Sequence, residues 1–113
     1  MPRKQFINSG YQIMWLFAIF DLPTNTKKER GDAARFRNFL LNNGFTMFQY
    51  SVYARPCGNE AYEEKQRRLI REAIPPEGEV RLFSLTDRQM SKMENYVGST
   101  RKEPEKDEQL MLF

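Results

Sequence analysis

The chain has 113 residues, which is enough for one domain with a single modest hydrophobic core. Its 40% of hydrophobic residues lets it fold rather than stay disordered. It has no histidine and one cysteine, Cys57, which excludes Ser-His and Cys-His nucleophiles, His-ligated zinc and an internal disulfide. Any chemistry must therefore come from carboxylates, hydroxyls, Lys and Arg, with a hard metal ion that takes oxygen ligands.

Charge and hydropathy indicate the compartment and the class of partner. The polar start of the chain has no signal-peptide pattern, and no apolar run approaches the roughly 20 residues that span a bilayer, so we expect a cytoplasmic protein without membrane contact. The net charge is +3, but residues 1–58 hold eight Lys and Arg against three Asp and Glu, whereas residues 59–113 hold ten against twelve. The basic half predicts a polyanionic partner. Taken by itself, this charge distribution is explained equally well by ordinary scatter of charged residues along the chain.

The first predicted strand is the apolar run Met14–Phe20, which stops at Asp21. Seven apolar residues without a break indicate a strand buried on both faces, central in a sheet that helices cover on at least one side. A helix from Thr26 to about Asn43 follows, since TKKE is a capping box and the next residue, Gly44, supplies a stop. The face expected to pack on the sheet consists of Ala33, Phe36, Phe39 and Leu40.

The middle of the chain, residues 45–54, is aromatic and β-branched and predicts either one strand or two joined by a kink. A second helix is predicted over Glu60–Ala73, with Asn59 as its cap and PPEG as its end. A strand over Glu79–Thr86 and a short helical turn complete the order β-α-β-(β)-α-β. This alternation predicts an α+β sandwich of the ferredoxin-like type. The buried stripe expected on the second helix is Tyr62, Leu69, Ile70 and Ala73.

The domain is expected to span residues 1–98, with residues 1–12 as a polar N-terminal extension. Residues 99–113 form a charged linker with an apolar end. That end either folds back onto its own core or pairs as a strand with another subunit, and the length of the linker favours the partner. The residues of this apolar end are Leu110, Met111, Leu112 and Phe113.

Three segments carry a resemblance to a known family. YQIMWLFAIFDLPTNTKKER, LLNNGFTMFQYSVYARPC and IPPEGEVRLFSLTDRQM resemble, in order and spacing, the small CRISPR-associated adaptation protein, the second of the two proteins common to most CRISPR loci. The first two segments look most like the versions from type II systems. The resemblance covers residues 11 to 97, which is most of the domain.

This resemblance implies a ferredoxin-like fold and a symmetric homodimer, in which an acid at the end of the first strand binds a divalent metal across the two-fold axis. Members are described as metal-dependent endonucleases on RNA or DNA. In spacer acquisition the dimer bridges two dimers of the larger integrase subunit and holds the DNA duplex to be inserted. Asp21 matches the metal acid, whereas Pro56 stands where some relatives carry a histidine, so any role of that histidine is absent.

Asp21 has two interpretations. From the residues alone, a carboxylate that caps the turn before Pro23 is the favoured one; the resemblance instead favours a Mg²⁺ ion shared between the Asp21 side chains of two chains, since one carboxylate is a poor magnesium site. No second acid is evident beside Asp21, so a nuclease of low turnover, or none in the cell, also fits. Ser51, Tyr53 and Arg55 on the next strand can add a hydrogen bond or stabilise charge on a phosphate.

Cationic side chains of the first helix are the predicted nucleic-acid contacts. Lys28 and Arg35 fall on one flank of the buried stripe and Arg30 and Arg37 on the other, so two basic rows can meet duplex phosphates; a plain solvated helix face is the alternative. The full predicted set is Lys27, Lys28, Arg30, Arg35, Arg37 and Arg55. On the second helix, Glu63 with Arg67 and Glu64 with Arg68 are balanced pairs that predict a solvated face.

Two functions follow: a DNA-binding architectural dimer of CRISPR adaptation, and a metal-dependent endonuclease that acts through paired Asp21. They are compatible with each other. A third, a ferredoxin-like regulatory domain for a small ligand, is disfavoured because the sequence has no Gly-rich loop.

Overall fold

The structure, a computed structural model, describes residues 13–98. The N-terminal extension and the apolar C-terminal segment Leu110–Phe113 therefore lie outside the described residues. The elements are β1 (Met14–Asp21), α2 (Lys27–Asn42), β2 (Thr46–Gln49), β3 (Val52–Cys57), α3 (Glu60–Ala73), β4 (Glu79–Thr86) and α4 (Asp87–Met90).

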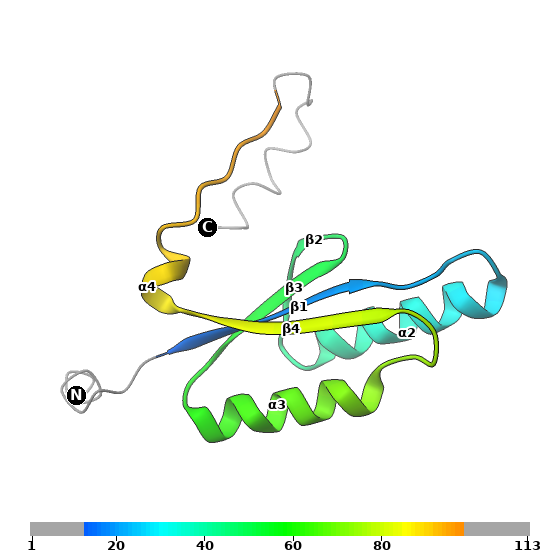
Figure 1. The fold of residues 1–113 in the computed structure, drawn as a ribbon, viewed down its shortest axis with the longest axis horizontal. Coiled ribbons are helices and arrows are strands. Elements are labelled where there is room, and N and C mark those ends of the chain that lie inside the picture. Colours follow the sequence, from blue (N-terminus) through cyan, green and yellow to red (C-terminus); the bar gives the residue numbers. More distant parts are fainter. Residues whose placement is uncertain (1–12, 99–113) are drawn as a thin grey trace.

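One four-stranded sheet organises the fold, with the strand order β2-β3-β1-β4 (Figure 1). β1 is central and pairs antiparallel with both β3 and β4, while β2 pairs antiparallel with β3. Helices α2 and α3 pack on the same face of this sheet, as their shared core shows. The predicted α+β, ferredoxin-like arrangement is confirmed.

The core lies between the sheet and the two helices. Alternate residues of β1 face the helices because successive side chains of a strand point to opposite faces. Burial of such side chains stabilises the fold by about 1.5–3 kcal/mol each. The most completely buried members of this core are Leu16, Ala18, Leu40, Cys57 and Ile70.

The predicted helix starts and the first helix stop are confirmed. The Thr26 hydroxyl accepts from the Glu29 amide at 3.1 Å, and the Glu29 carboxylate accepts from the Thr26 amide at 3.0 Å. Asn59 caps α3 by accepting from the Tyr62 amide at 2.8 Å. Gly44 has φ +85°, and a Cβ there would lie 2.7 Å from an Arg55 Nη atom, so only glycine fits this turn.

The second face of the sheet is not covered by α2 or α3, although β1 was expected to be buried on both faces. An aromatic strip, consisting of Trp15, Phe17, Phe48 and Phe83, covers it instead. Phe17 is 4% exposed because it stacks on Phe83 at 5.0 Å and meets the edge of Phe48 at 5.6 Å. Phe83 of the strip and Ile19 beside it each remain 37% exposed. This face is therefore apolar and open to solvent.

The segment 45–54 forms two strands rather than one. β2 and β3 are joined by a tight turn at Tyr50 and Ser51, and their register shifts between Met47 and Gln49. This bulge brings the ring of Phe48 against Trp15 and Phe17.

The buried stripe expected on α3 is partly wrong. Ile70 is fully buried, but Glu63 and Gln66 are buried while Leu69 is only half-buried. Glu63 tolerates this position because Arg67 and Ser84 of β4 both donate to its carboxylate.

The predicted pairs on α3 also differ in part. Glu63 pairs with Arg67 at 3.0 Å as expected, whereas Glu64 pairs with Arg71 at 3.5 Å and not with Arg68. The helix surface near β4 is consequently an ionic contact inside the fold, not a wholly solvated face.

Among residues 13–98, no helix combines the length and apolarity that crossing a bilayer requires.

Candidate functional site

Asp21 is the last residue of β1 and is exposed. It points to the same face of the sheet as Phe17 and Ile19, the face that α2 and α3 leave open. In the pairing of β1 with β4, Asp21 lies directly opposite Glu79. Directly opposed residues of an antiparallel pair share a face, with Cβ atoms about 4.5–5.5 Å apart. The carboxylates of Asp21 and Glu79 therefore lie next to each other on this face of the sheet.

Glu79 is the acid that sequence reasoning missed. The expectation that no second acid lies beside Asp21 is corrected by the register of β4. The signal was available in the fold class, because the first and last strands of a ferredoxin-like sheet are antiparallel neighbours. The last residue of the first strand then meets the first residue of the last one. Glu79 is itself held by Arg81, whose guanidinium lies 3.1 Å from its carboxylate.

A glycine allows this meeting of strand ends. Gly78 has φ +106°, and a Cβ at this position would lie 2.9 Å from the Asp21 carbonyl oxygen and 2.6 Å from Leu22 Cδ2. The chain can therefore pass tightly over the end of β1 and enter β4 with Glu79 in register. Any other residue at 78 would strain the backbone and push β4 away from Asp21.

The donor set suits a hard divalent cation in kind but not in number. Carboxylate oxygens are the protein ligands that Mg²⁺ prefers, and Mg²⁺ usually keeps several waters beside one or two carboxylates. Within residues 13–98 no group of three or more acidic or sulfur ligands converges. Asp21 and Glu79 could hold such an ion, and a fuller set of ligands would have to come from a second chain.

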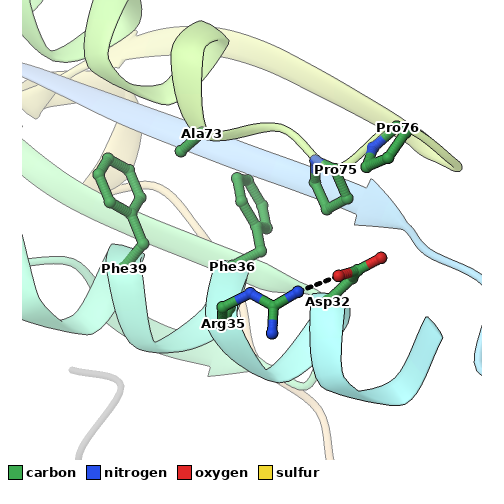
Figure 2. Close-up of a pocket in the computed structure, with 7 residues that line it drawn as sticks. All are labelled: Asp32, Arg35, Phe36, Phe39, Ala73, Pro75 and Pro76. Atoms are coloured by element: carbon green, nitrogen blue, oxygen red, sulfur yellow. Dashed lines mark hydrogen bonds and ion pairs between the residues drawn. The ribbon is translucent and has the colours of Figure 1, made fainter. Parts of the chain in front are cut away.

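On one flank of α2 the predicted free cations share a buried acid. Asp32, only 8% exposed, forms ion pairs with Lys28 at 3.0 Å and with Arg35. Figure 2 shows the pair with Arg35. The side chains of Lys28 and Arg35 are still 76% and 74% exposed, so both can also reach an anion in solvent. The flank has a net charge of +1 instead of +2.

A cavity of about 350 Å³ opens next to this ion pair, between α2 and the end of α3 (Figure 2). It lies on the helical side of the molecule, whereas Asp21 points to the other face of the sheet. It is therefore separate from the acid pair. Its lining is Asp32, Arg35, Phe36, Phe39, Ala73, Pro75 and Pro76.

The other predicted cations have intramolecular contacts. Arg30 donates to the carbonyl oxygens of the loop before α2 at 3.2 and 3.3 Å, and Arg37 lies over the ring of Tyr50. Arg55 donates to the Asn43 carbonyl at 2.6 Å. Lys27 is exposed at the first turn of α2.

Of the neighbours expected to assist Asp21, only Ser51 lies near it, since its carbonyl accepts from the Phe20 amide at 3.1 Å. Tyr53 is 1% exposed in the core, where burial raises the pKa of its hydroxyl. Arg55 pairs with Leu16 in the middle of β1, away from Asp21.

Cys57 is fully buried, and burial raises the pKa of its thiol, with smaller opposing effects from nearby charges. A buried thiol is a poor nucleophile because the thiolate is the reactive form.

With this geometry known, comparison with known families gives a clear result. The family model described as CRISPR associated protein Cas2 matches residues 14–93. The chain belongs to the Cas2 family. The resemblance read from the three sequence segments is thereby confirmed. The matched region contains Asp21, Glu79 and every cationic residue discussed above, whereas residues 99–113 lie beyond it.

Several Cas2 relatives match most of the chain. The CRISPR-associated endoribonuclease Cas2 of Parvibaculum lavamentivorans is 45% identical over 101 residues, covering 88% of this chain and 100% of the relative. The protein of the same name from Flavobacterium psychrophilum is 40% identical over 104 residues, 91% of this chain and 90% of the relative. That of Ligilactobacillus salivarius is 41% identical over 90 residues, 80% of this chain and 89% of the relative.

Proposed function

We propose that this Cas2-family chain serves CRISPR spacer acquisition as a homodimeric, metal-dependent endonuclease that also binds nucleic acid. One observation carries the proposal: Asp21 and Glu79 stand side by side on the uncovered, apolar face of the sheet. The names of the relatives, CRISPR-associated endoribonucleases, support RNA as a substrate.

The open face supports the homodimer. An apolar sheet face in water is costly, and such faces commonly mark an interface. Phe83, a member of the aromatic strip, and the neighbouring Ile19 are each 37% exposed on this face. A second copy packed face to face about a two-fold axis would cover them and bring its own Asp21 and Glu79 toward the first pair.

Mg²⁺ fits between these acids. Unscreened carboxylates at short range repel, so a dimer that brings two acid pairs together is stabilised by a cation between them. Asp21 and Glu79 would hold the ion, and Arg81 would fix the orientation of Glu79 through their 3.1 Å ion pair. When bound, the ion supplies Lewis-acid stabilisation of the charge that develops on a phosphodiester during hydrolysis.

Exposed cations on α2 support the binding of a nucleic-acid backbone. Lys27, Lys28 and Arg35 are exposed, and contacts of this kind to phosphates carry no sequence information. Arg30 and Arg55 contribute to the fold first, since each donates to main-chain carbonyls.

A purely architectural role is the second candidate. In it the dimer binds the duplex DNA to be inserted and bridges dimers of the larger integrase subunit, without physiological cleavage. The partial neutralisation of the α2 surface by Asp32 favours neither role. The architectural role is favoured because Asp21 and Glu79 alone give a nuclease few catalytic groups. The integrase contact is proposed for the segment Leu110–Phe113.

Replacement of Asp21 tests the nuclease. We expect Asp21→Asn to lower metal-dependent cleavage of a labelled RNA at least about 100-fold, the scale on which a positioned catalytic group acts. Duplex DNA binding should stay unchanged, because the contacts to duplex phosphates are proposed for the cations of α2. Glu72→Gln, a change of an exposed acid on α3, is the matched control. Full cleavage by Asp21→Asn would refute the nuclease, and acquisition that persists without cleavage would favour the architectural role.

A further inference from the structure

Tyr50 is an unusual aromatic residue in this chain. It lies in the tight turn between β2 and β3 and is 67% exposed, unlike the aromatic side chains of the core and of the aromatic strip. One face of its ring is nonetheless occupied, because the Cζ atom of Arg37 lies 4.0 Å from the ring centroid. This is well within cation–π range. The ring is thus supported from behind and open in front.

Arg37 is held in place by aromatic rings and not by an acid. It is half-buried, its Cζ atom lies 6.0 Å from the Phe20 ring, and its charge is close enough to Tyr53 to act on that hydroxyl. Among residues 13–98 no carboxylate forms an ion pair with Arg37, and its buried Nε atom has no hydrogen-bond partner there. The contrast with Lys28 and Arg35, which share Asp32, is clear.

This stack lies at the same end of the sheet as the acid pair. The carbonyl of Ser51, the residue after Tyr50, accepts from the amide of Phe20 at 3.1 Å, and Phe20 precedes Asp21. The β2–β3 turn is therefore tied to the end of β1. A nucleotide on Tyr50 would therefore lie at the end of the sheet where β1 ends, on the side of Arg37 and α2, whereas the Asp21 side chain points to the other face.

We propose that Tyr50 and Arg37 form a binding site for an unpaired nucleotide of single-stranded RNA or DNA, with the base stacked on the open face of Tyr50 and a phosphate near Arg37. A base inside a duplex is already stacked on both sides and cannot use the ring. Stacking of this kind tolerates any sequence, since every base has a π face. The site rests on the proposed function only in that it would hold a single strand at the end of the sheet where β1 ends.

The guanidinium behind the ring strengthens such a site in two ways. It fixes the ring orientation before binding, which lowers the ordering cost of the complex. It also supplies a positive charge that no described acid neutralises. A role confined to stiffening the turn would need the stack but would not need the outer face of the ring to be open.

Binding measurements on the full chain test the site. The probes are a short fluorescent oligouridylate and a blunt duplex of the same length, titrated by anisotropy. We expect Tyr50→Ala to weaken binding of the single strand by about 5- to 150-fold, the worth of one stacked base, and to leave duplex binding unchanged. Tyr50→Trp should retain single-strand binding because the indole also stacks.

Tyr96→Ala is the matched control, since Tyr96 is an exposed tyrosine, 83% accessible, at a different place on the chain. We expect it to change neither affinity. Arg37→Gln should reduce the salt slope of single-strand binding by about 0.7, the contribution of one phosphate contact. Equal losses on both probes, or no loss for Tyr50→Ala in a protein with unaltered melting temperature, would overturn the site.

The same measurements separate this inference from the nuclease. Asp21→Asn should cleave nothing yet bind the single strand as the unmodified chain does. If neither the unmodified chain nor any variant cleaves, but Tyr50→Ala still loses affinity for the single strand, the binding site is supported and the nuclease proposal is refuted. If cleavage depends on Asp21 while Tyr50→Ala binds normally, the reverse holds.

Discussion

At the scale of single residues, the acid pair depends on a glycine. A Cβ at Gly78 would lie 2.9 Å from the Asp21 carbonyl oxygen, so glycine at this position lets β4 begin in register with the end of β1. Glu79 follows directly and faces the same way as Asp21. The function of one carboxylate is therefore inseparable from the conformation of a residue that carries no side chain.

Removal of the second carboxylate should show its share in the reaction. We expect Glu79→Gln to weaken the metal dependence of cleavage, so that more Mg²⁺ is needed for half-maximal rate, while Asp21→Asn lowers the rate at every Mg²⁺ concentration. In the proposed site Glu79 would be the weaker ligand, because it is also paired with Arg81. A titration of rate against Mg²⁺ is the measurement, and Glu77→Gln, an exposed neighbour, is the control. An unaltered Mg²⁺ requirement would remove Glu79 from the site.

At the scale of elements, α2 combines a face that packs in the core with a basic surface. A buried carboxylate of the same helix lowers the net charge of that surface. Asp32 is buried under the helix surface and binds Lys28 and Arg35 together. The i,i+4 and i,i+3 spacings put all three side chains on one side of the helix. The acid thereby fixes the two cations on that flank and reduces the attraction of the flank for polyanions.

Asp32→Asn should therefore bind nucleic acid more tightly. Removing one negative charge between two cations frees both for phosphate, and at contact distance in water a unit charge is worth about 1 kcal/mol, or about fivefold in affinity. The salt dependence of duplex binding should steepen as well. Glu72→Gln on α3 is again the control. Weaker or unaltered binding by Asp32→Asn, with the fold intact by circular dichroism, would contradict a phosphate role for this flank.

At the scale of the whole molecule, the two faces of the sheet differ. α2 and α3 cover one face (Figure 1). The other face presents the aromatic strip, with Asp21 and Glu79 at its end. A sandwich with only two layers leaves such a face uncovered unless another chain covers it. The proposed dimer thus follows from the layer arrangement, and the metal site follows from the dimer.

Phe83→Arg tests whether the proposed metal site depends on the face-to-face dimer. Phe83 is 37% exposed and stacks on Phe17, so a charge there should prevent face-to-face packing with little damage to the core. We expect sedimentation velocity to show a monomer, and cleavage to fall although Asp21 is present. Leu41→Arg, a charge at a 48% exposed position of α2 on the other side, should leave the dimer intact. A dimer that survives Phe83→Arg would place the interface elsewhere.

Local signals explain why the sequence predicted so much of the fold. Thr26 with Glu29, Asn59 and Gly44 act within one turn of the chain, so the limits of both long helices follow from nearby residues alone. The apolar run Met14–Phe20 likewise predicts a central strand. Where the signal was not local, the prediction was incomplete. Glu63 on α3 is buried where Arg67 and Ser84, a residue of the distant strand β4, both donate to its carboxylate.

By itself, the sequence determined the fold class, the family and Asp21 as the candidate acid, because these depend on periodicity, caps and motifs that lie close together in the chain. Only the tertiary structure decided what surrounds Asp21. Its pairing with Glu79 is a matter of strand register between the two ends of the domain, and the stack of Arg37 on Tyr50 joins a helix to a distant turn. Register and packing are set by contacts summed over the whole sheet, which no short stretch of sequence contains.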